Sequence, residues 1–287
     1  MVDTELSSPD SGRKLFFGLF IFPLIIAIGM AALMCTVVLM THEKETPETL
    51  IAALKKSPPS KRWQKAFELS NELNRDTKNP PSETVSREML SVLRDAENFD
   101  PKTRSYMALA LSHDPSEEVY SALVSALDDS EEEVRVHTLW SLGLSGKTDA
   151  APLIQKRLAD DSSEVRKTAA YVLGALRVTA AEPALKLALA DPIADVRWNA
   201  ALALARLGNS DGYDILLSML ERERLSHELN LDETQIESVM VNAMRGLVLI
   251  PKADSIKILQ TISKGDRNLR VRQASLDSLK QLESIHS

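Results

Sequence analysis

The sequence predicts an all-α protein: a right-handed α-solenoid of about seven helical hairpins, preceded by one transmembrane helix. Three observations lead to this prediction. Short motifs recur at a constant interval along the chain. The composition is rich in Ala and Leu, only 5% of residues are aromatic, and no alternating strand pattern follows residue 45. One long run near the N-terminus carries no charge.

An Asp-x5-Arg motif fixes the period of the repeat. Its aspartates stand at positions 129, 160 and 191, so three successive copies are displaced by the same interval, and the motif returns once near the C-terminus. These pairs are Asp129 and Arg135, Asp160 and Arg166, Asp191 and Arg197, and Asp266 and Arg272. A fixed period of this length is typical of stacked helical units, each of which contacts only its neighbours.

The apolar periodicity and the breaks between helices define the expected segments. We expect a short cytoplasmic tail (1–14), a transmembrane signal anchor (15–41), a linker (42–49) and a solenoid (50–287). The expected helix pairs are Pro47–Lys56 with Ser60–Leu73, Ser82–Glu97 with Pro101–Leu111, Ser116–Leu127 with Glu132–Leu144, Ala150–Leu158 with Ser163–Leu176, Ala181–Leu189 with Ala194–Leu207, Asp211–Leu225 with Asp232–Leu249, and Asp254–Ser263 with Asn268–Leu282. Ser116, Ser163 and Asp211 are the expected N-caps, because each offers a side-chain oxygen to unpaired backbone N–H groups.

Leu15 to Met40 is a run of 26 uncharged residues. As a helix it is roughly 39 Å long, enough to cross a bilayer core of about 30 Å. A cleaved signal peptide has a shorter apolar region, and a lipoprotein signal requires a small residue where Met34 precedes Cys35. We therefore favour an uncleaved anchor that contacts the lipid bilayer through residues 15–40.

The flanking charges predict the orientation of this anchor. Arg13 and Lys14 adjoin its N-terminal end, and basic residues near a span stay in the cytoplasm. Lys55 and Lys56 beyond the other end weaken the contrast. We expect a single-pass protein of the bacterial inner membrane, with a cytoplasmic N-terminus and periplasmic repeats.

Charge and residue counts disfavour several classes of function. The formal net charge of −7 argues against nucleic acid as a partner, because phosphate backbones require clustered Lys and Arg. One cysteine allows no internal disulfide. The five histidines stand at 42, 113, 137, 227 and 286, with no two at a metal-ligand spacing on one helix. We expect no metal, no cofactor and no catalytic residue.

Two segments resemble a known family. Residues 160–176 (DDSSEVRKTAAYVLGAL) and 191–207 (DPIADVRWNAALALARL) are similar to the second helix of the short bacterial HEAT repeat, the phycobilisome-lyase-like variety. The resemblance is strong over residues 114–208 and weaker elsewhere. It implies an α-solenoid that works in protein binding or scaffolding.

The resemblance also implies a structural role for the repeated charges. In such repeats the Asp and Arg form a ladder between and within units. That role passes to Asp129, Arg135, Asp160, Arg166, Asp191, Arg197, Asp266 and Arg272. An aspartate in the turn can cap the next helix, and the planar guanidinium can bridge carboxylates or carbonyls. The alternative is a row of arginines that binds anions.

A stripe beside this ladder is the candidate binding surface. Aligning the second helices brings together positions that carry Trp, Tyr and a nearby cation, the residue types favoured at interface hot spots. The stripe consists of Val136, His137, Trp140, Lys167, Tyr171, Trp198 and Asn199. The competing interpretation is that its aromatic side chains fill the core between units.

Known enzymes with this repeat provide an alternative function. Deoxyhypusine hydroxylase binds iron through repeated His-Glu pairs, but this chain has only His42-Glu43 and His227-Glu228. Phycobilin lyases share the repeat, although the repeat alone does not carry their chemistry. We expect a non-enzymatic, membrane-tethered scaffold or adaptor for a membrane-associated protein, for example as an accessory subunit of an inner-membrane complex. The alternative is a lyase-like or cofactor-handling enzyme.

The segment Arg222 to Gln235 departs from the period. Two further periods after Asp191 lead to position 253, whereas the next copy of the motif begins at Asp266, so extra residues intervene. Insertions in solenoids lie on one face and often bind ligands. A lengthened hairpin is the equally simple alternative.

Overall fold

A computed structural model of the chain describes residues 16–41, 45–75 and 79–286. All regular structure in these residues is helical, as the sequence predicts. The chain divides into two compact units, Met1–Thr46 and Pro47–Ser287. The expected cytoplasmic tail (1–14) and residues 42–44 of the expected linker lie outside the described residues.

Residues 16–41 of the N-terminal unit form one apolar helix. A π-helical turn, η1 (Phe17–Ile21), leads into α2 (Phe22–Thr41). The window Phe17–Val37 has a mean hydropathy of 2.5, and none of it is buried. By length and composition this helix can cross a membrane, and a signal sequence would have the same two properties.

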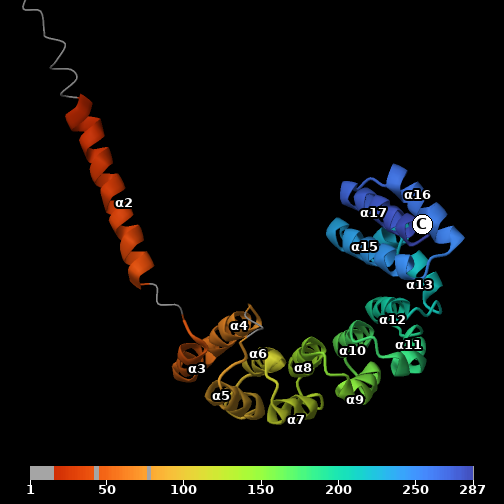
Figure 1. Ribbon diagram of the computed structural model, residues 1–287, viewed down its shortest axis with the longest axis horizontal. Coiled ribbons are helices and arrows are strands. Elements are labelled where there is room, and N and C mark those ends of the chain that lie inside the picture. The colour runs from red at the N-terminus through yellow and green to blue at the C-terminus, as the bar shows by residue number, and fades with distance from the viewer. Residues whose placement is uncertain (1–15, 42–44, 76–78, 287) are drawn as a thin grey trace, which may run out of the picture. The chain divides into compact units, whose positions relative to one another are not determined.

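The second unit is a stack of seven consecutive helix pairs within residues 47–75 and 79–286 (Figure 1). The first helices are α3 (Pro47–Lys56), α5 (Glu83–Arg94), α7 (Glu117–Ala126), α9 (Ala151–Lys156), α11 (Glu182–Ala188), α13 (Tyr213–Ser218) with α14 (Arg222–His227), and α16 (Ala253–Gly265). The second helices are α4 (Pro59–Arg75), α6 (Pro101–Ala110), α8 (Glu132–Ser145), α10 (Ser163–Ala175), α12 (Ala194–Arg206), α15 (Glu233–Leu249) and α17 (Leu269–His286). Short 3-10 turns are η2 (Leu111–His113), η3 (Thr148–Ala150), η4 (Arg157–Ala159) and η5 (Thr179–Ala181).

Some helix boundaries differ from the expected ones. Ser116 is the N-cap of α7, as expected, and accepts from the backbone N–H of Val119. The expectation for Ser163 is wrong by one residue, because Ser162 caps α10. The expected helix over 211–225 is wrong: Asp211 caps nothing, and two short helices, α13 and α14, occupy this range.

The second helices pack directly on one another from unit to unit. In Figure 1 the helices α4, α6, α8, α10 and α12 follow the inner side of the curved stack. Close approach depends on small residues: a Cβ at Gly174 of α10 would lie 2.6 Å from both Cα and Cβ of Ala203 on α12. A larger residue at this position would therefore force the backbones of α10 and α12 apart.

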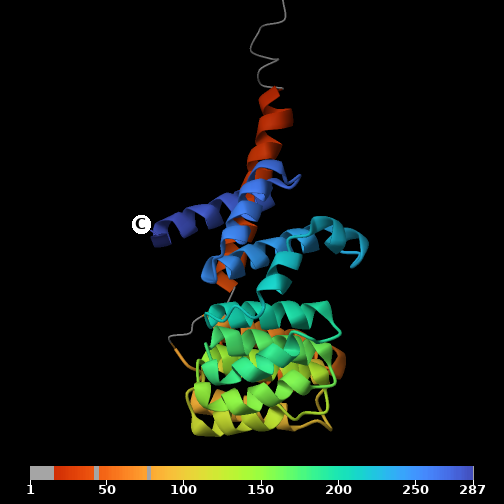
Figure 2. The ribbon, with the colours of Figure 1, turned by 90° about the vertical axis from the view of Figure 1, so that its right-hand side faces the viewer.

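The buried side chains form two clusters that meet at α12. The first runs from Leu50 to Leu204 and the second from Trp198 to Leu282. Helix α12 supplies Val196 and Ala200 to the first cluster, and Ala201 to the second. Figure 2 shows the yellow-to-green helices in near-parallel layers, whereas the blue C-terminal helices turn away from that direction.

Candidate functional site

The arginines of the central units bond the aspartate of the following unit. Arg135 donates from Nε and Nη2 to the carboxylate of Asp160, at 3.1 and 2.9 Å. Arg166 donates in the same way to Asp191, at 2.7 and 3.0 Å. Because two parallel N–H···O bonds match guanidinium to carboxylate geometry, each pair ties two units together. We call this series of contacts the arginine ladder.

The ladder also holds each turn between helices in place. The Nη1 of Arg166 donates to the carbonyl oxygens of Asp160 and Asp161, at 2.9 and 3.0 Å. Asp160 in turn accepts from the backbone N–H of Ser162 at 3.0 Å. Each motif therefore organises its own turn while its charged groups reach the neighbouring units.

Mutual hydrogen bonding shifts the pKa values of the Arg166–Asp191 pair. The Arg166 guanidinium holds the pKa of the Asp191 carboxyl below its ordinary value, and the backbone N–H of Ile193 adds to this effect. The same hydrogen bond raises the pKa of Arg166. Both side chains are mostly buried, at 14% and 9% exposure, so the charged pair is stabilised as a unit.

The ladder changes at Arg197. Its Nη1 donates to the carbonyl oxygens of Asp191 and Pro192, at 2.6 and 2.9 Å. Within the described residues, however, Arg197 forms no ion pair. Asp266 is instead held by Arg222, at 3.0 and 2.7 Å, and Arg272 likewise forms no ion pair in the described part of the chain.

Aromatic side chains of the second helices contact one another along the inner side of the stack. The Phe67 and Tyr106 ring centroids are 5.3 Å apart, and those of Tyr106 and His137 are 5.4 Å apart. Trp140 follows one turn further along α8, and its ring lies 4.9 Å from that of Tyr171. The row ends with Arg206, whose guanidinium lies over the Tyr171 ring, 4.9 Å from its centroid. We call Phe67, Tyr106, His137, Trp140, Tyr171 and Arg206 the inner aromatic row.

The row is partly exposed. Phe67 is 43% exposed, and the other members are half-buried. Tyr106 and Tyr171 pack against the first core cluster. Burial raises the pKa of Tyr106, and the nearby Glu133 charge adds to the shift. Rings of this kind present a rigid apolar surface with polar edges, which suits protein recognition.

The other expected stripe residues have different environments. Val136 is half-buried against the first cluster. Lys167 pairs with Glu164 at 2.7 Å, and Asn199 donates to the carbonyl of Asp195. Trp198 is only 8% exposed and belongs to the second core cluster.

Three members of the inner aromatic row were not among the expected residues. Tyr106 precedes His137 by one period of the repeat, so the period itself could have identified it. Phe67 precedes the regular repeats. Arg206 lies in a register otherwise filled by Leu144 and Ala175, which gives no hint of its contact.

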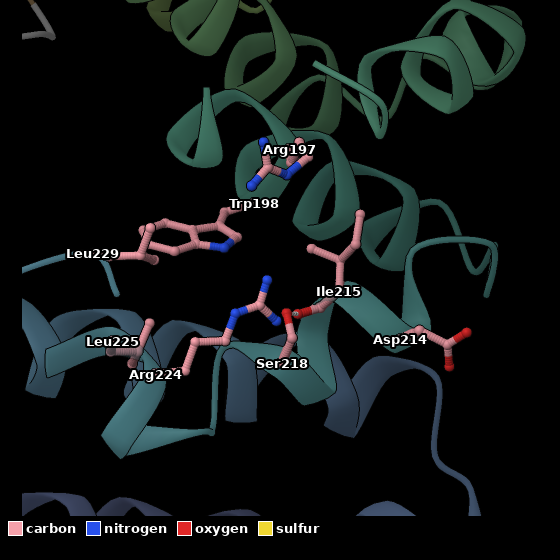
Figure 3. A pocket seen from close by; sticks show the side chains of 8 residues that line it. All are labelled: Arg197, Trp198, Asp214, Ile215, Ser218, Arg224, Leu225 and Leu229. Atoms are coloured by element: carbon pink, nitrogen blue, oxygen red, sulfur yellow. Dashed lines mark hydrogen bonds between the residues drawn. The ribbon is translucent and has the colours of Figure 1, made fainter. Parts of the chain in front are cut away.

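A pocket of about 230 Å³ opens between α12, α13 and α14. Its lining combines cations with apolar side chains: Arg197, Trp198, Asp214, Ile215, Ser218, Arg224, Leu225 and Leu229. Figure 3 shows Arg224 pointing from α14 toward α12, with the indole of Trp198 beside Leu229. The pocket thus lies where the ladder changes.

Histidine and acidic side chains form no metal-binding cluster in the described residues. No group of three or more His, Cys, Asp or Glu side chains there could hold a metal ion. His137 contacts Tyr106, and His227 lies 3.2 Å from Glu223 on α14. His42 is outside the described residues.

A family model described as HEAT repeats matches this chain twice, over residues 86–174 and 151–226. These matches include Arg104, which pairs with Asp129, the later ladder arginines from Arg135 to Arg222, and most of the inner aromatic row. No curated protein matches the chain in sequence.

Solved structures with the same fold are only distantly similar. YIBA of E. coli is 15% identical, covers 83% of this chain and 93% of its own, and gives a TM-score of 0.53. The complex of CpcE and CpcF of phycocyanin lyase from Nostoc sp. PCC7120 is 19% identical, covers 84% and 96%, and gives 0.51. Human deoxyhypusine hydroxylase is 15% identical, covers 83% of this chain and 96% of its own, and gives a TM-score of 0.34.

The family model and the stacked helix pairs agree on the nature of the solenoid. YIBA and the CpcE–CpcF complex share this fold. The chain is therefore a HEAT-repeat protein, with an apolar helix N-terminal to its α-solenoid in the sequence.

Proposed function

We propose that this protein is a membrane-tethered HEAT-repeat scaffold or adaptor that binds a partner protein through the inner aromatic row. One observation carries the proposal: rings from α4, α6, α8 and α10 contact a ring of the neighbouring unit at each step and remain partly exposed. A core would enclose such rings. A partner could bury their remaining surface, and each ring contributes a large apolar area at low entropic cost.

The apolar N-terminal helix supports the tether. The window Phe17–Val37 is unburied and long enough for a bilayer. With Arg13 and Lys14 on its N-terminal side, the proposed orientation is a cytoplasmic N-terminus and a periplasmic solenoid at a bacterial inner membrane. The proposed partner is therefore membrane-associated, and the protein is an accessory subunit of its complex.

The proposed role is non-enzymatic. In the inner aromatic row the only titratable groups are two phenols, one imidazole and one guanidinium, and Arg206 lies over the Tyr171 ring. A lyase-like role that handles a cofactor is the second candidate, because the CpcE–CpcF complex of phycocyanin lyase has this fold. That role predicts a pigment or another cofactor retained by the purified protein.

The test is affinity capture of the full-length protein from its native membranes, with mass spectrometry of what is retained. The double variant Trp140→Ala, Tyr171→Ala removes the centre of the row. Tyr120→Ala is the matched control, because this half-buried ring stacks with Lys147 but belongs to the first-helix side, on α7. Circular dichroism of each variant verifies that the solenoid remains folded.

We expect a partner that the wild type and the control retain, and that the folded double variant loses by about tenfold or more, as for a hot-spot pair. Equal retention by the double variant would place the interface elsewhere. A full-length protein captured alone in several detergents, or one that carries a pigment, would contradict the scaffold role.

A further inference from the structure

The arginine ladder has a fixed chemical pattern in the regular units. Each ladder arginine pairs with the residue 25 positions later, as in Arg135 with Asp160 and Arg166 with Asp191. The same step from Arg197 leads to Arg222. One unit therefore has a cation where the preceding units have the carboxylate that receives the guanidinium.

The carboxylates that Arg222 contacts are already engaged in ion pairs. Arg222 takes Asp266 in a two-bond fork and also donates to Glu233 at 2.8 Å. Glu233 further pairs with Arg267. No acidic group of the described chain replaces the missing partner of Arg197.

The N–H groups of Arg197 that form no ion pair in the described residues are the same ones that bind a carboxylate in Arg135 and Arg166. In Arg166 the Nη1 bonds the turn carbonyls, while Nε and Nη2 hold Asp191. In Arg197 the Nη1 bonds the turn carbonyls in the same way. Its Nε and Nη2 have no ion-pair partner in the described residues, so a fork suited to a carboxylate remains free.

A pocket lies at this guanidinium (Figure 3). Arg224 provides a second cation there, although Glu228, at 3.2 Å, already shares its charge. Asp214 also lines the pocket but forms no ion pair with Arg197 or Arg224. The remaining wall is largely apolar, from Trp198, Ile215, Leu225 and Leu229.

The size of the pocket restricts its ligand. Its volume of about 230 Å³ is below the range of about 300–1,000 Å³ typical of small-molecule sites. A side chain or two of a protein segment fits this space better than a cofactor. The cations and apolar side chains of the lining suit a ligand with one carboxylate beside one apolar group.

We propose that this pocket binds an aspartate or glutamate of the partner protein, next to an apolar residue, with Arg197 gripping the carboxylate. The inference rests on the proposed function and names the chemistry of the partner. The partner's carboxylate takes the place that an aspartate of the next unit takes in the regular ladder. Arg197 is then a specificity-determining residue rather than a fastening of the stack.

The test titrates the full chain, in detergent micelles and labelled with 15N-arginine, with the blocked dipeptide acetyl-Asp-Leu-amide. The Nε–H resonance of Arg197 is assigned by its loss in Arg197→Gln. We expect saturable shifts with a dissociation constant on the order of 1 mM, as suits so small a ligand. Acetyl-Asn-Leu-amide should bind at least about tenfold more weakly, because it lacks the charge that strengthens the hydrogen bonds.

Two variants provide the controls. Arg197→Lys keeps the charge but loses the planar fork, so it should weaken binding of the Asp dipeptide. Arg272→Gln removes the same charge from another ladder position without an ion pair in the described residues, and it should leave binding unchanged. Circular dichroism confirms that the variants are folded. Equal binding of the Asp and Asn dipeptides, no saturation, or tighter binding of inorganic phosphate would overturn the proposal.

The outcome is separable from that of the proposed function. If membranes yield a partner that depends on Trp140 and Tyr171 while the Asp dipeptide fails to bind, the carboxylate site is wrong and the scaffold role stands. If the dipeptide binds at Arg197 but no partner is captured, the scaffold role fails and the pocket remains a carboxylate site.

Discussion

In both the central and the C-terminal units, an arginine binds an aspartate that lies further along the chain, but the number of residues between the two differs. On α6, α8 and α10, a ladder arginine and its aspartate are 25 residues apart: Arg104 pairs with Asp129, Arg135 with Asp160 and Arg166 with Asp191. In the C-terminal units, Arg222 reaches Asp266 across 44 residues. Both arrangements end in the same two-bond fork between a guanidinium and a carboxylate, each largely removed from water.

The difference shows that geometry, and not sequence spacing, defines the ladder. The longer path from Arg222 to Asp266 runs through α14, the long α15 and α16. At the position where Arg197 would find its aspartate, 25 residues later, the chain has Arg222, and Arg222 itself pairs with Asp266. A unit can therefore be longer than the others and still form an arginine–aspartate contact, while Arg197 is left without an ion pair in the described residues.

The largest expected effect separates a paired arginine from the unpaired one. Arg166→Ala leaves the mostly buried Asp191 carboxylate without its cation and should lower the free energy of unfolding by about 3 kcal/mol. Arg197→Ala leaves no carboxylate of the described chain unpaired, and its loss of two carbonyl bonds should cost about 1 kcal/mol. Urea unfolding of the full chain in micelles measures both. Equal costs would mean that the ion pair contributes nothing.

The next largest effect concerns how closely the helices pack in each region. Gly174→Ala places a Cβ 2.6 Å from the backbone of Ala203 and should cost about 2 kcal/mol. Gly246→Ala in α15 brings its Cβ to 3.0 Å from the side-chain ends of Leu202 and Leu216, which can move. Its gain in helix propensity of up to about 1 kcal/mol should offset most of that contact. Urea midpoints that fall equally in both would contradict this contrast.

Acid should remove the contribution of the central ladder in a defined pH window. Because hydrogen bonding from Arg166 lowers the pKa of Asp191 in the folded state, its stabilisation is fully present above the unfolded pKa of about 3.9. It is lost as the pH falls through the lower, folded pKa. Wild type should exceed Asp191→Asn by about 1.5 kcal/mol at pH 7. Thermal melts from pH 7 downward should show this difference shrinking only below the unfolded pKa. A difference that stays constant to the lowest pH would rule out this linkage.

The smallest expected effect lies at the junction of the two regions. Lys186 of α11 pairs with Asp211, just before α13, at 2.7 Å, and both side chains are well exposed. Water and salt screen such a pair. Lys186→Ala should leave the urea midpoint unchanged within error, and a clear loss would mean that this surface pair holds the two regions together.

Much of the fold could be predicted because residue types recur at a fixed interval that matches one helix pair. The positions of Val134, Val165 and Val196 fix the phase of the helices, and all three are fully buried. Local chemistry is harder to predict: Ser162 and Ser163 are equally good caps by type, and only the turn geometry selects Ser162. Asp211 lies near a helix start but does not cap it.

The partners of the charged residues could be predicted only in part. The motif pairs Asp160 with Arg166 in sequence, yet the carboxylate of Asp160 belongs to Arg135 of the preceding unit. That choice depends on how units stack, which a single motif does not contain. The pair of Arg222 and Asp266 follows no period, so the sequence offers no signal for it.

Helix α12 has a consequence for how the chain folds during synthesis. Domains fold from the N-terminus as the ribosome extends them. The first core cluster is complete once Leu204 has emerged. The opposite face of α12, with Trp198 and Ala201, has its packing partners only after α13 to α15 have been made. For that interval the nascent solenoid ends in an uncovered apolar face, and the irregular C-terminal units act as the cap that closes it.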